Sequence, residues 1–485
     1  MWATVRLIRA TLAFGLIALD YLLQLGLARL FPRSDRVDRR WERLHGRNAR
    51  RLYRGCVRLR GVYIKMGQVL SVMGTFLPAP FQRELAGLQD AVPPQPWRTI
   101  RRALVQALGE DFMRHFRTFS ETPVAAASLG QVHAAETVDG ERVAVKVLYP
   151  NVKTIIKVDL RVLGWAMWLY KLFVPMQQLD RVLVQLRAML ARETDLTQEA
   201  RALGRMAADF ADEPAVALPP VVPALSTATV LTMGFMDGVK VSDKAGLLAL
   251  GLDPHAVGEV LVKAFYRAIF VHRFFHADPH PGNFLVTRGD AGAPRLVILD
   301  LGSAAELDDR LASGITHLLA GFMARNDAMI VAGMEKIGFV APDGDRALLQ
   351  QTVSKYFAKL AELNLTDLSQ VDFRTAERFV DPELKRRELR TLMRALAYPE
   401  GWFEVERTAI MLFALSANLA PKLNTIEVGF PWVMRFLAKN PLPMVPRPTV
   451  EAAAHAASPT GTAHVDVTPL GALAEPAPVG QAQGS

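Results

Sequence analysis

The chain has 485 residues, enough to bury a large core and to form two or three domains of ordinary size. Hydrophobic residues make up 51% and charged residues 22%, which indicates an ordered protein, and the single cysteine, Cys56, excludes an internal disulfide framework or a cysteine-rich zinc site. The net charge of +9 is concentrated in residues 29–60, where twelve arginines accompany three acidic residues, so the rest of the chain is balanced.

The N-terminal segment carries an apolar run, Thr11–Ala28, whose eighteen residues are the lower limit for a helix that spans a bilayer. At helical spacing, one face of this segment collects its polar residues: Arg6, Arg9, Asp20 and Gln24. Such a face favours a helix that lies in the membrane interface. Residues 1–60 are therefore predicted to associate with a membrane, either by spanning it or by lying on it. A helix packed against the protein's own core is the alternative.

The arginine block that follows predicts an anionic partner. Phospholipid headgroups are favoured over nucleic acid, because no aromatic-interleaved or zinc-finger motif accompanies the arginines. A solvated arginine-rich helix would explain the same composition. We therefore expect anionic membrane lipids as partners, no nucleic acid, and a location at the cytoplasmic face of a membrane, the inner membrane in a bacterium.

The next elements are predicted from helical periodicity, proline breaks and strand-like alternation. Residues 61–117 have a helical pattern that prolines interrupt. Beginning at Thr122 the pattern changes, and alternation in GQVHAAETVDGERVAVKVLYP predicts two strands joined by a turn at Asp139-Gly140. Residues 153–210 are again helical, and TVLTMGFMDG then predicts a strand and a turn.

The second half begins with a long predicted helix, Pro254–Phe275, and a proline-rich loop. A hairpin follows between NFLVT and LVILD, and helical patterns continue from Glu306 to about Leu437. Beyond Asn440 the chain is rich in alanine, proline, threonine and glycine and has little charge, which predicts disorder. This order of strands and helices is the two-lobed layout of a protein kinase, with nucleotide bound between the lobes.

We therefore predict an α+β fold of the bilobal, protein-kinase-like type with an N-terminal helical extension. The expected regions are a membrane-associating segment, a helical extension, an N-lobe with a helical insertion, a helical C-lobe with the catalytic loop, and a disordered tail. In the same order, these regions are residues 1–60, 61–120, 121–237, 238–440 and 441–485.

The segments HADPHPGNFLV and LVILDLGSA carry the residues that point to phosphoryl transfer. That reaction needs a carboxylate near the acceptor hydroxyl, together with an amide and a second carboxylate on Mg²⁺. Asp278 and Asn283 lie five positions apart, the spacing of a kinase catalytic loop. Asp300 in DLG follows the next hairpin, where kinases have their metal-binding aspartate. We predict Asp278 as the catalytic carboxylate, and Asn283 and Asp300 as metal ligands.

The same loop has a second interpretation, in which His276, Asp278 and His280 bind a metal as in metallohydrolases. Two features favour phosphoryl transfer instead. Prolines on both sides of His280 fix a loop, and the hairpin that ends in Asp300 suits phosphate chemistry.

Lys146 in VAVKV lies among apolar residues on the last strand of the N-terminal hairpin. A buried lysine is costly unless its charge is paired, and nucleotide phosphates together with a helix carboxylate would supply that pairing. Glu199 in ETDLTQEA is the candidate carboxylate. An exposed strand lysine is the other interpretation of the same pattern.

Four segments in this order, YIKMGQ, AAASLGQVH, ETDLTQEA and HADPHPGN, resemble the UbiB (ADCK-type) family of atypical kinase-like proteins over about residues 60–430. The resemblance implies that Lys146 and Glu199 form the ion pair of an active kinase. It also implies that Asn283 and Asp300 hold Mg²⁺, with Asp278 in the catalytic-base position.

The resemblance further places an alanine-rich loop where ordinary kinases have glycines at the nucleotide: Ala125, Ala126, Ala127 and Ser128. Alanine disfavours positive φ and restricts the approach of backbone amides to phosphates. An altered nucleotide preference and poorer transfer geometry are therefore implied.

In this family the KxGQ helix covers the place where a peptide substrate would lie. Here that helix contains Lys65 and Gln68, and the resemblance gives Lys65 two carboxylate partners in the ExD motif, Glu193 and Asp195. From its own neighbours alone, Lys65 would be an ordinary helix lysine.

The implied activity is binding of ATP and Mg²⁺, with ATP hydrolysis or phosphorylation of a small molecule or lipid rather than general protein phosphorylation. The implied biology is ubiquinone biosynthesis or the handling of isoprenoid, quinone-type lipids at a membrane, with other ubiquinone-biosynthesis proteins as partners. The alternative is a nucleotide-gated scaffold that binds lipid or protein with little or no turnover.

The sequence departs from the expected kinase pattern at several places, one of which is Leu301 in place of the usual phenylalanine. Gly234 stands where a hinge glutamate is expected, so that adenine contacts there would come from backbone groups. Lys146 and Glu199 are 53 residues apart, which requires an inserted helical segment near residues 153–178.

Overall fold

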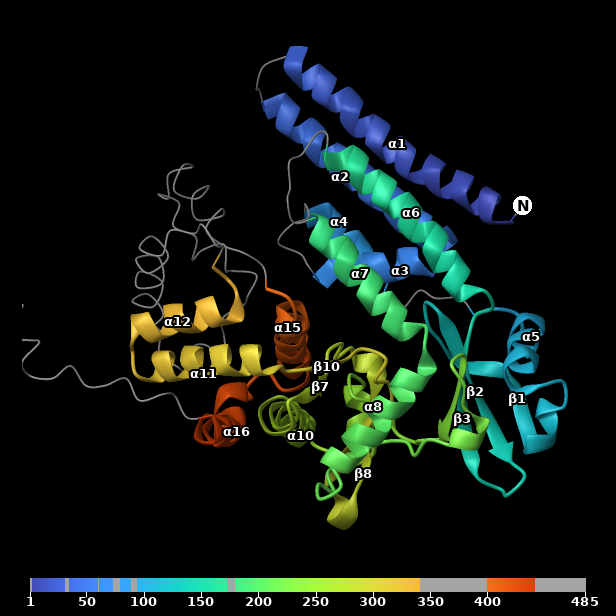
Figure 1. Ribbon diagram of the computed structural model, residues 1–485, viewed down its shortest axis with the longest axis vertical. Coiled ribbons are helices and arrows are strands. Elements are labelled where there is room, and N and C mark those ends of the chain that lie inside the picture. Colours follow the sequence, from blue (N-terminus) through green and yellow to red (C-terminus); the bar gives the residue numbers. More distant parts are fainter. Residues whose placement is uncertain are drawn as a thin grey trace, which may run out of the picture. The chain divides into compact units, whose positions relative to one another are not determined.

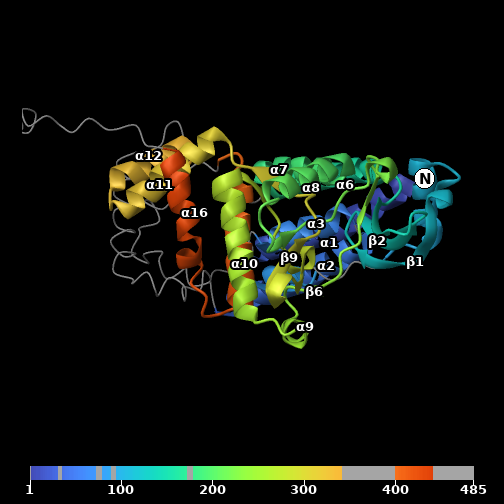
Figure 2. The same ribbon diagram turned by 90° about the horizontal axis from the view of Figure 1, so that it is seen from below.

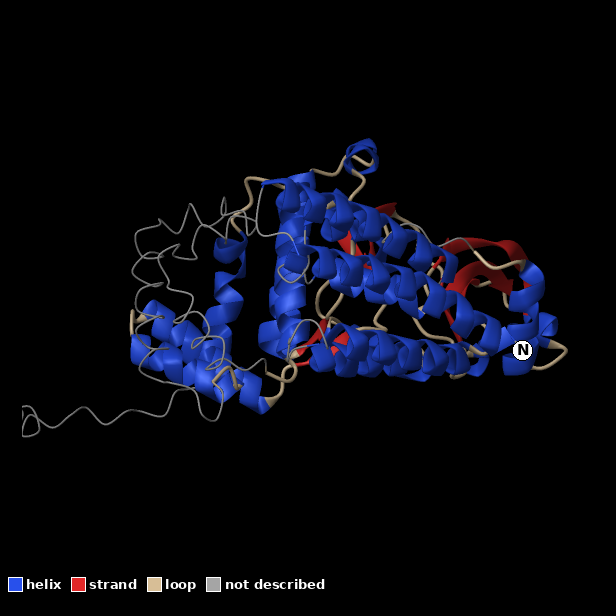
Figure 3. Ribbon diagram, turned by 90° about the horizontal axis from the view of Figure 1, so that it is seen from above, coloured by secondary structure: helices blue, strands red, loops and turns tan. Residues whose placement is uncertain are grey.

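The computed structural model describes residues 2–30, 35–59, 61–72, 79–88, 94–171, 179–340 and 399–440. The predicted disordered tail, residues 441–485, lies outside the described residues, as does the stretch 341–398 of the predicted helical region. Figure 1 shows the described elements coloured along the chain, and Figure 3 distinguishes helices from strands.

The N-terminal region is helical. α1 (Trp2–Leu30) and α2 (Asp35–Leu59) form a pair, followed by α3 (Val62–Val72) and α4 (Ala79–Ala86). α1 packs against α2 and also against α6 (Val152–Lys171), which comes from much later in the chain. Figure 1 shows α1, α2 and α6 running alongside one another.

Polar side chains of α1 contact the protein's own body. Arg6 donates to Asp159 of α6 from two nitrogens, Nε to Oδ1 at 2.7 Å and Nη2 to Oδ2 at 2.6 Å. Asp20 accepts from Arg47 of α2 at 2.9 Å. These contacts correspond to the alternative in which the N-terminal helix packs on the protein itself. None of the described helices is both long and apolar enough to cross a membrane.

A four-stranded antiparallel sheet follows, in the order β1 (Phe116–Ala126), β2 (Gly130–Thr137), β3 (Arg142–Leu148) and β5 (Val230–Gly234). The predicted hairpin at Asp139-Gly140 is confirmed as β2–β3, and Gly140 has φ +86°, which glycine adopts without strain. The expectation that strand pattern begins only at Thr122 is wrong, because β1 starts at Phe116. β1 is mostly exposed, so its sequence lacks the alternation of a half-buried strand.

The two faces of β3 have different neighbours. Val143, Val145 and Val147 lie in one core cluster with Ile100 and Leu104 of α5 (Trp97–Leu108). Successive side chains of a strand point to opposite faces. Lys146 therefore points away from α5, into the side of the sheet where α8 (Leu196–Asp209) lies.

The inserted helical segment is present between β3 and α8. It consists of α6 and α7 (Leu179–Glu193). α8 begins at a cap in which Asp195 Oδ1 accepts from the Thr197 N–H at 3.1 Å. This start places Glu199 in the first turn of α8, where it is buried.

The helices of the second half are α9 (Lys244–Ala249), α10 (Pro254–Arg267), α11 (Asp309–Met323), α12 (Asp327–Ile337), α15 (Trp402–Leu419) and α16 (Thr425–Lys439). α10 packs against α15 and α16, and Figure 2 shows α10 beside α16. The predicted helix Pro254–Phe275 is too long: α10 continues only as a π-helical turn, Ala268–His272, and Arg273 at φ +55° ends it. The apolar residues that follow belong to a strand instead.

Two small sheets carry the loops of interest. β7 (Phe274–His276) pairs with β10 (Ala304–Glu306), and the predicted hairpin is formed by β8 (Phe284–Arg288) and β9 (Pro294–Ile298). β6 (Val239–Lys240) and β4 (Val216–Ala217) flank that hairpin in the order β4-β9-β8-β6. The β7–β8 loop presents Asp278 and Asn283, and the chain after β9 presents Asp300. The α+β, bilobal, kinase-like fold is therefore confirmed.

Candidate active site

Lys146 is the centre of a charged cluster that joins the sheet to the chain after β9. Its Nζ lies 2.7 Å from Oε1 and 2.8 Å from Oε2 of Glu199, and 2.6 Å from Oδ2 of Asp300. Glu199 is buried, and Lys146 is nearly so. The structure thus brings together three residues from β3, α8 and the segment after β9, one cation between two carboxylates.

Burial and mutual attraction act differently on these three groups. Burial, reinforced by the Asp300 carboxylate, raises the pKa of Glu199 to about 7, although Lys146 opposes the rise. Burial disfavours the charged amine, but Asp300 and Glu199 outweigh it and raise the pKa of Lys146 above its ordinary value. Burial acts on Asp300 too, yet Lys146 and the Gly302 N–H hold its pKa well below the usual range. Glu199 is therefore the member of the cluster that titrates near neutral pH.

The segment after β9 is fixed by its own backbone. Asp300 Oδ1 accepts from the Gly302 N–H at 2.8 Å, and Leu301 between them is buried. A Cβ on Gly302 would lie 3.2 Å from Asp300 Oδ1 and 3.4 Å from Glu199 Oε2. Glycine therefore lets this turn pass close to both carboxylates.

The β7–β8 loop orders the second pair of predicted residues. Asn283 Nδ2 donates to the carbonyl oxygen of Asp278 at 3.1 Å and lies 3.2 Å from His276 Nε2. Burial lowers the pKa of His276 to about 4, so its ring is neutral at neutral pH. The loop thus holds Asn283 by its amide nitrogen and leaves its amide oxygen as the atom suited to a cation.

Lys65 reaches this loop from α3. Its Nζ pairs with Glu193 and lies 3.5 Å from Asp278 Oδ2, and Glu193 also accepts from Ser303 Oγ at 3.2 Å. Burial would lower the pKa of Lys65, but the Glu193 and Asp278 carboxylates outweigh it and raise that pKa. A cation of the N-terminal extension therefore stands against the predicted catalytic carboxylate.

The other two residues expected around Lys65 are Asp195 and Gln68. Asp195 was expected to pair with Lys65, but its side chain caps α8 and also accepts from Thr197 Oγ1 at 2.7 Å. Both of these bonds are local in sequence, and the carboxylates that Lys65 contacts are those of Glu193 and Asp278. Gln68 lies on α3 one turn after Lys65, and its side chain is outside the described residues.

The alanine-rich segment lies at the edge of the sheet: Ala125 and Ala126 end β1, and residues 127–129 connect it to β2. The Ala127 N–H donates to the Gly130 carbonyl at 2.8 Å, and Ala125 and Ala127 are exposed while Ser128 is buried. A Cβ on Gly130 would lie 2.5 Å from the Val147 carbonyl oxygen, so this position needs glycine. The three alanines keep ordinary negative φ angles.

Gly234 ends β5 at the position where a hinge glutamate was expected. Its N–H donates to the Pro220 carbonyl at 2.8 Å, and an added Cβ would lie 2.8 Å from Pro220 Cδ. A side chain at this position would therefore collide with Pro220, which accounts physically for the glycine.

The donor set suits Mg²⁺. This ion takes oxygen ligands and usually only one or two carboxylates from a protein, with water and phosphates completing its shell. Asp300 offers a carboxylate and Asn283 an amide oxygen. Across the described ranges, no three His, Cys, Asp or Glu side chains converge to hold a metal ion. The metallohydrolase arrangement of His276, Asp278 and His280 is therefore not formed, and His280 Nδ1 instead accepts from the Gly282 N–H at 3.1 Å.

Comparison with known proteins places this geometry in a family. The ABC1 atypical kinase-like domain matches residues 87–334, slightly more than half of the chain. The chain belongs to the ABC1 (UbiB/ADCK) atypical kinase-like family.

Named relatives of this ABC1-family protein come from bacteria, plants and animals. It is 30% identical over 391 residues to "Probable protein kinase UbiB" of Shewanella piezotolerans, covering 78% of this chain and 68% of the relative. It is 29% identical to "Protein ACTIVITY OF BC1 COMPLEX KINASE 8, chloroplastic" of Arabidopsis thaliana, covering 80% of this chain but only 54% of that protein. It is 29% identical to "AarF domain-containing protein kinase 1" of Xenopus laevis, covering 70% of this chain and 65% of the relative.

A solved structure shares the fold. The Rv3197 protein of Mycobacterium tuberculosis, solved in complex with erythromycin, aligns with a TM-score of 0.51 and 25% identity. The alignment covers 81% of this ABC1-family chain and 98% of that chain. The likeness therefore includes most of the described elements.

Arg407 is a site residue of this ABC1-family protein that the sequence patterns missed. It lies on α15 and is buried. Its Nε donates at 2.7 Å to the carbonyl oxygen of Ala277, the residue immediately before Asp278. Its guanidinium lies 5.4 Å from the Phe403 ring centroid. Burial would raise the pKa of Asp278, but Lys65 and then Arg407 hold it below its usual value. The available signal was a single arginine inside a largely apolar helix pattern.

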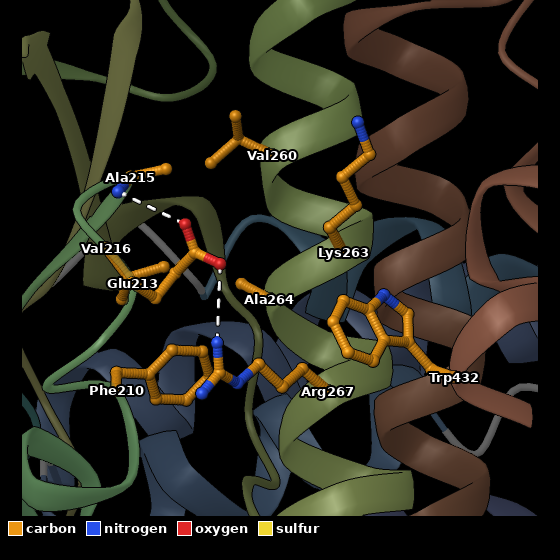
Figure 4. Close-up of a pocket in the computed structure, with 9 residues that line it drawn as sticks. All are labelled: Phe210, Glu213, Ala215, Val216, Val260, Lys263, Ala264, Arg267 and Trp432. Carbon is orange, nitrogen blue, oxygen red and sulfur yellow. Dashed lines mark hydrogen bonds and ion pairs between the residues drawn. The ribbon is translucent and has the colours of Figure 1, made fainter. Parts of the chain in front are cut away.

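A second contact missed from sequence fixes the far end of α8. Arg267 of α10 pairs with Asp212, and its Nη1 lies 3.4 Å from Glu213 Oε2. The guanidinium also lies 5.4 Å from the Phe210 ring centroid. Figure 4 shows Phe210, Glu213 and Arg267 around a small pocket of about 70 Å³, with Trp432 of α16 on its other side. Because α8 carries Glu199, this contact ties the helix of the ion pair to the C-lobe.

Proposed function

We propose that this protein binds Mg²⁺–ATP between the sheet and the β7–β8 loop and cleaves its γ-phosphate bond. The observation that carries the proposal is Lys146 held between Glu199 and Asp300 at 2.6–2.8 Å. A kinase-type site needs a lysine aligned by a helix carboxylate and close to the metal-binding aspartate.

Each residue has a role in this proposal. Lys146 contacts the nucleotide phosphates, and Asp300 and Asn283 hold Mg²⁺. When bound, the metal neutralises charge on the phosphates. Asp278 orients the acceptor hydroxyl or a water molecule and receives its proton.

We propose that the acceptor is water, a small molecule or a lipid rather than a protein chain. This part rests on Lys65, which lies 3.5 Å from Asp278 and pairs with Glu193. A peptide substrate would have to displace α3 and break this buried contact. A small hydroxyl compound needs less room.

Membership in the ABC1 family and likeness to a protein named UbiB support a pathway as well. We propose a role in ubiquinone biosynthesis or in the handling of isoprenoid, quinone-type lipids, at the cytoplasmic face of a membrane. Lipids with anionic headgroups and other proteins of that pathway would be its partners.

A nucleotide-gated scaffold with little turnover is the second candidate. It is favoured by the Lys65 cation against Asp278 and by the alanines at positions 125–127, where Cβ atoms restrict the approach of amides to phosphates. Such a protein would bind ATP and change its affinity for a partner without consuming the nucleotide.

The deciding experiment measures Mg²⁺-dependent ATP hydrolysis by the full chain, with and without anionic liposomes, beside Asp300→Asn and the exposed control Asp309→Asn. Hydrolysis that Asp300→Asn abolishes and Asp309→Asn preserves supports the enzyme. The other result is that calorimetry detects nucleotide binding but hydrolysis does not exceed that of Asp300→Asn. This result would overturn the proposal of an enzyme and favour the scaffold.

A further inference from the structure

The outer face of α1 is apolar and exposed. Five residues lie on it at spacings of three and four, each between 50% and 61% exposed: Ile8, Leu12, Leu16, Leu19 and Leu23. Residues at this spacing fall on one side of a helix. We call this set the leucine stripe.

The leucine stripe belongs to a helix that is already held in place. On its other side α1 carries Ala10, which is fully buried, and Phe14, whose ring centroid lies 5.3 Å from that of Tyr63 on α3. Tyr21 hydrogen bonds His45 of α2 at 2.7 Å. The stripe is therefore a second apolar face, left over after α1 has packed on the protein.

The neighbouring helix α2 has an exposed basic face. Its members recur at spacings of three and four and are all exposed: Arg40, Arg43, Arg47, Arg50, Arg54 and Arg58. We call this set the arginine stripe. Within the stripe, Arg47 contacts the carboxylate of Asp20 and Arg50 lies 4.0 Å from that of Glu84.

The two stripes adjoin along the seam between α1 and α2. Asp20 directly follows Leu19 of the leucine stripe, and its Oδ2 accepts from Arg47 of the arginine stripe at 2.9 Å. At this contact, the apolar leucine stripe of α1 lies next to a guanidinium group of α2, and the two helices pack together.

We propose that this combined face docks on an anionic lipid bilayer, with α1 lying in the plane of the interface. It rests on the membrane association proposed above and names the surface that makes it. Only a lipid surface offers both environments side by side, acyl chains for leucines and phosphates for arginines. Nucleic acid would leave the leucines in water, and a second copy of this face would set arginine against arginine.

The test is co-flotation of the full chain with phosphatidylcholine vesicles, with and without phosphatidylglycerol, in the absence of nucleotide. Each arginine near an anionic surface strengthens binding roughly fivefold. Arg40→Gln/Arg54→Gln/Arg58→Gln should therefore weaken the partition on anionic vesicles by roughly a hundredfold. The matched variant Arg98→Gln/Arg101→Gln/Arg102→Gln removes exposed arginines of α5 and should bind as the wild type does.

The apolar half has its own variant. Leu12→Gln/Leu16→Gln/Leu19→Gln should abolish flotation on both kinds of vesicle. Glutamine at the exposed positions Val138, Leu248 and Ile426 should not. Because these side chains are exposed, circular dichroism should show unchanged folding for every variant.

Three results would overturn the proposal. One is flotation of the leucine-stripe variant equal to the wild type, and another is equal binding to neutral and anionic vesicles. The third is a dimer in solution that the leucine-stripe variant dissociates, which would assign the face to a second copy. Asp300→Asn serves as the control that separates membrane binding from ATP turnover. It should float as the wild type does even though it does not hydrolyse ATP.

Discussion

Lys65 Nζ lies 3.5 Å from Asp278 Oδ2, so a cation of the N-terminal extension neutralises a carboxylate of the β7–β8 loop. Glu193, at the end of α7, binds the same amine from the other side. The pKa of Asp278, the carboxylate expected to orient an acceptor, is therefore lowered by a residue that lies outside the two lobes. This arrangement makes the extension part of the site's electrostatics.

Lys65→Met should lower the free energy of unfolding by about 3 kcal/mol at neutral pH, because it leaves two partly buried carboxylates without their cation. The pKa of Asp278 is held below its ordinary value of 3.8, so its contribution is present above about pH 4 and is lost as pH falls. The deficit of the variant should shrink in acid. Urea unfolding at pH 7 and below pH 4 checks this.

Lys157→Met, on an exposed lysine of α6, is the control and should change the free energy of unfolding little. A deficit of Lys65→Met that stays constant down to low pH would contradict the electrostatic account.

Glu199→Gln should remove a pH dependence. The pKa of Glu199 is raised from an ordinary 4.5 to about 7, so the folded protein holds a proton that the unfolded chain releases. As the pH rises from 4.5 to 7, the free energy of unfolding of the wild type should therefore fall, relative to that of Glu199→Gln, by about 1 kcal/mol for each pH unit. His276 is common to both proteins and cancels in the comparison. Parallel unfolding curves across this window would show that Glu199 does not titrate there.

Arg407→Met should destabilise the protein by about 2–3 kcal/mol, because it leaves the Ala277 carbonyl without its buried donor. The pKa of Asp278 should rise, moving the acidic limb of the ATPase pH profile to higher pH. The exposed Arg435→Met is the control for losing one arginine. A variant that is destabilised but keeps the wild-type pH profile would limit Arg407 to a structural role.

Arg267→Met should loosen the end of α8 and weaken ATP binding severalfold, while the free energy of unfolding should change little because Asp212 is exposed and Glu213 is only partly buried. Lys263→Met, one turn earlier on α10 and paired with Glu259 at 2.8 Å, is the matched control. Calorimetric ATP titrations of Arg267→Met, Glu213→Gln and the double variant measure the coupling between the two residues. Purely additive losses would mean that the Arg267–Glu213 contact transmits nothing to the site.

Much of the site could be predicted because its residues lie in short motifs. The strand alternation around Lys146 indicated which hairpin carries it, and the spacing of Asp278 and Asn283 indicated a catalytic loop. Short strands such as β7 and β10 have three residues each, which is too few for an alternation of apolar and polar residues to be recognised. They were therefore not predicted. The helix predicted to run through Phe275 failed for the same reason.

Long-range contacts between unlike parts of the chain could not be predicted. Arg407 and Ala277 are 130 residues apart, and nothing local marks the arginine as a donor to the loop. Asp195 was assigned to Lys65 by resemblance, whereas capping by an aspartate before a helix is a local preference that won. Both cases turn on which partner is nearest in space.

Arg6 lies where four helices meet. Besides its two bonds to Asp159 on α6, its Nη1 donates to the Leu59 carbonyl of α2, and its guanidinium lies 5.7 Å from the Tyr63 ring centroid on α3. Asp159 is fully buried. A chain shortened by its first ten residues would therefore lose more than apolar contact area. It would leave the Asp159 carboxylate without its cation in the interior, against α3, the helix on which Tyr63 lies two residues before Lys65.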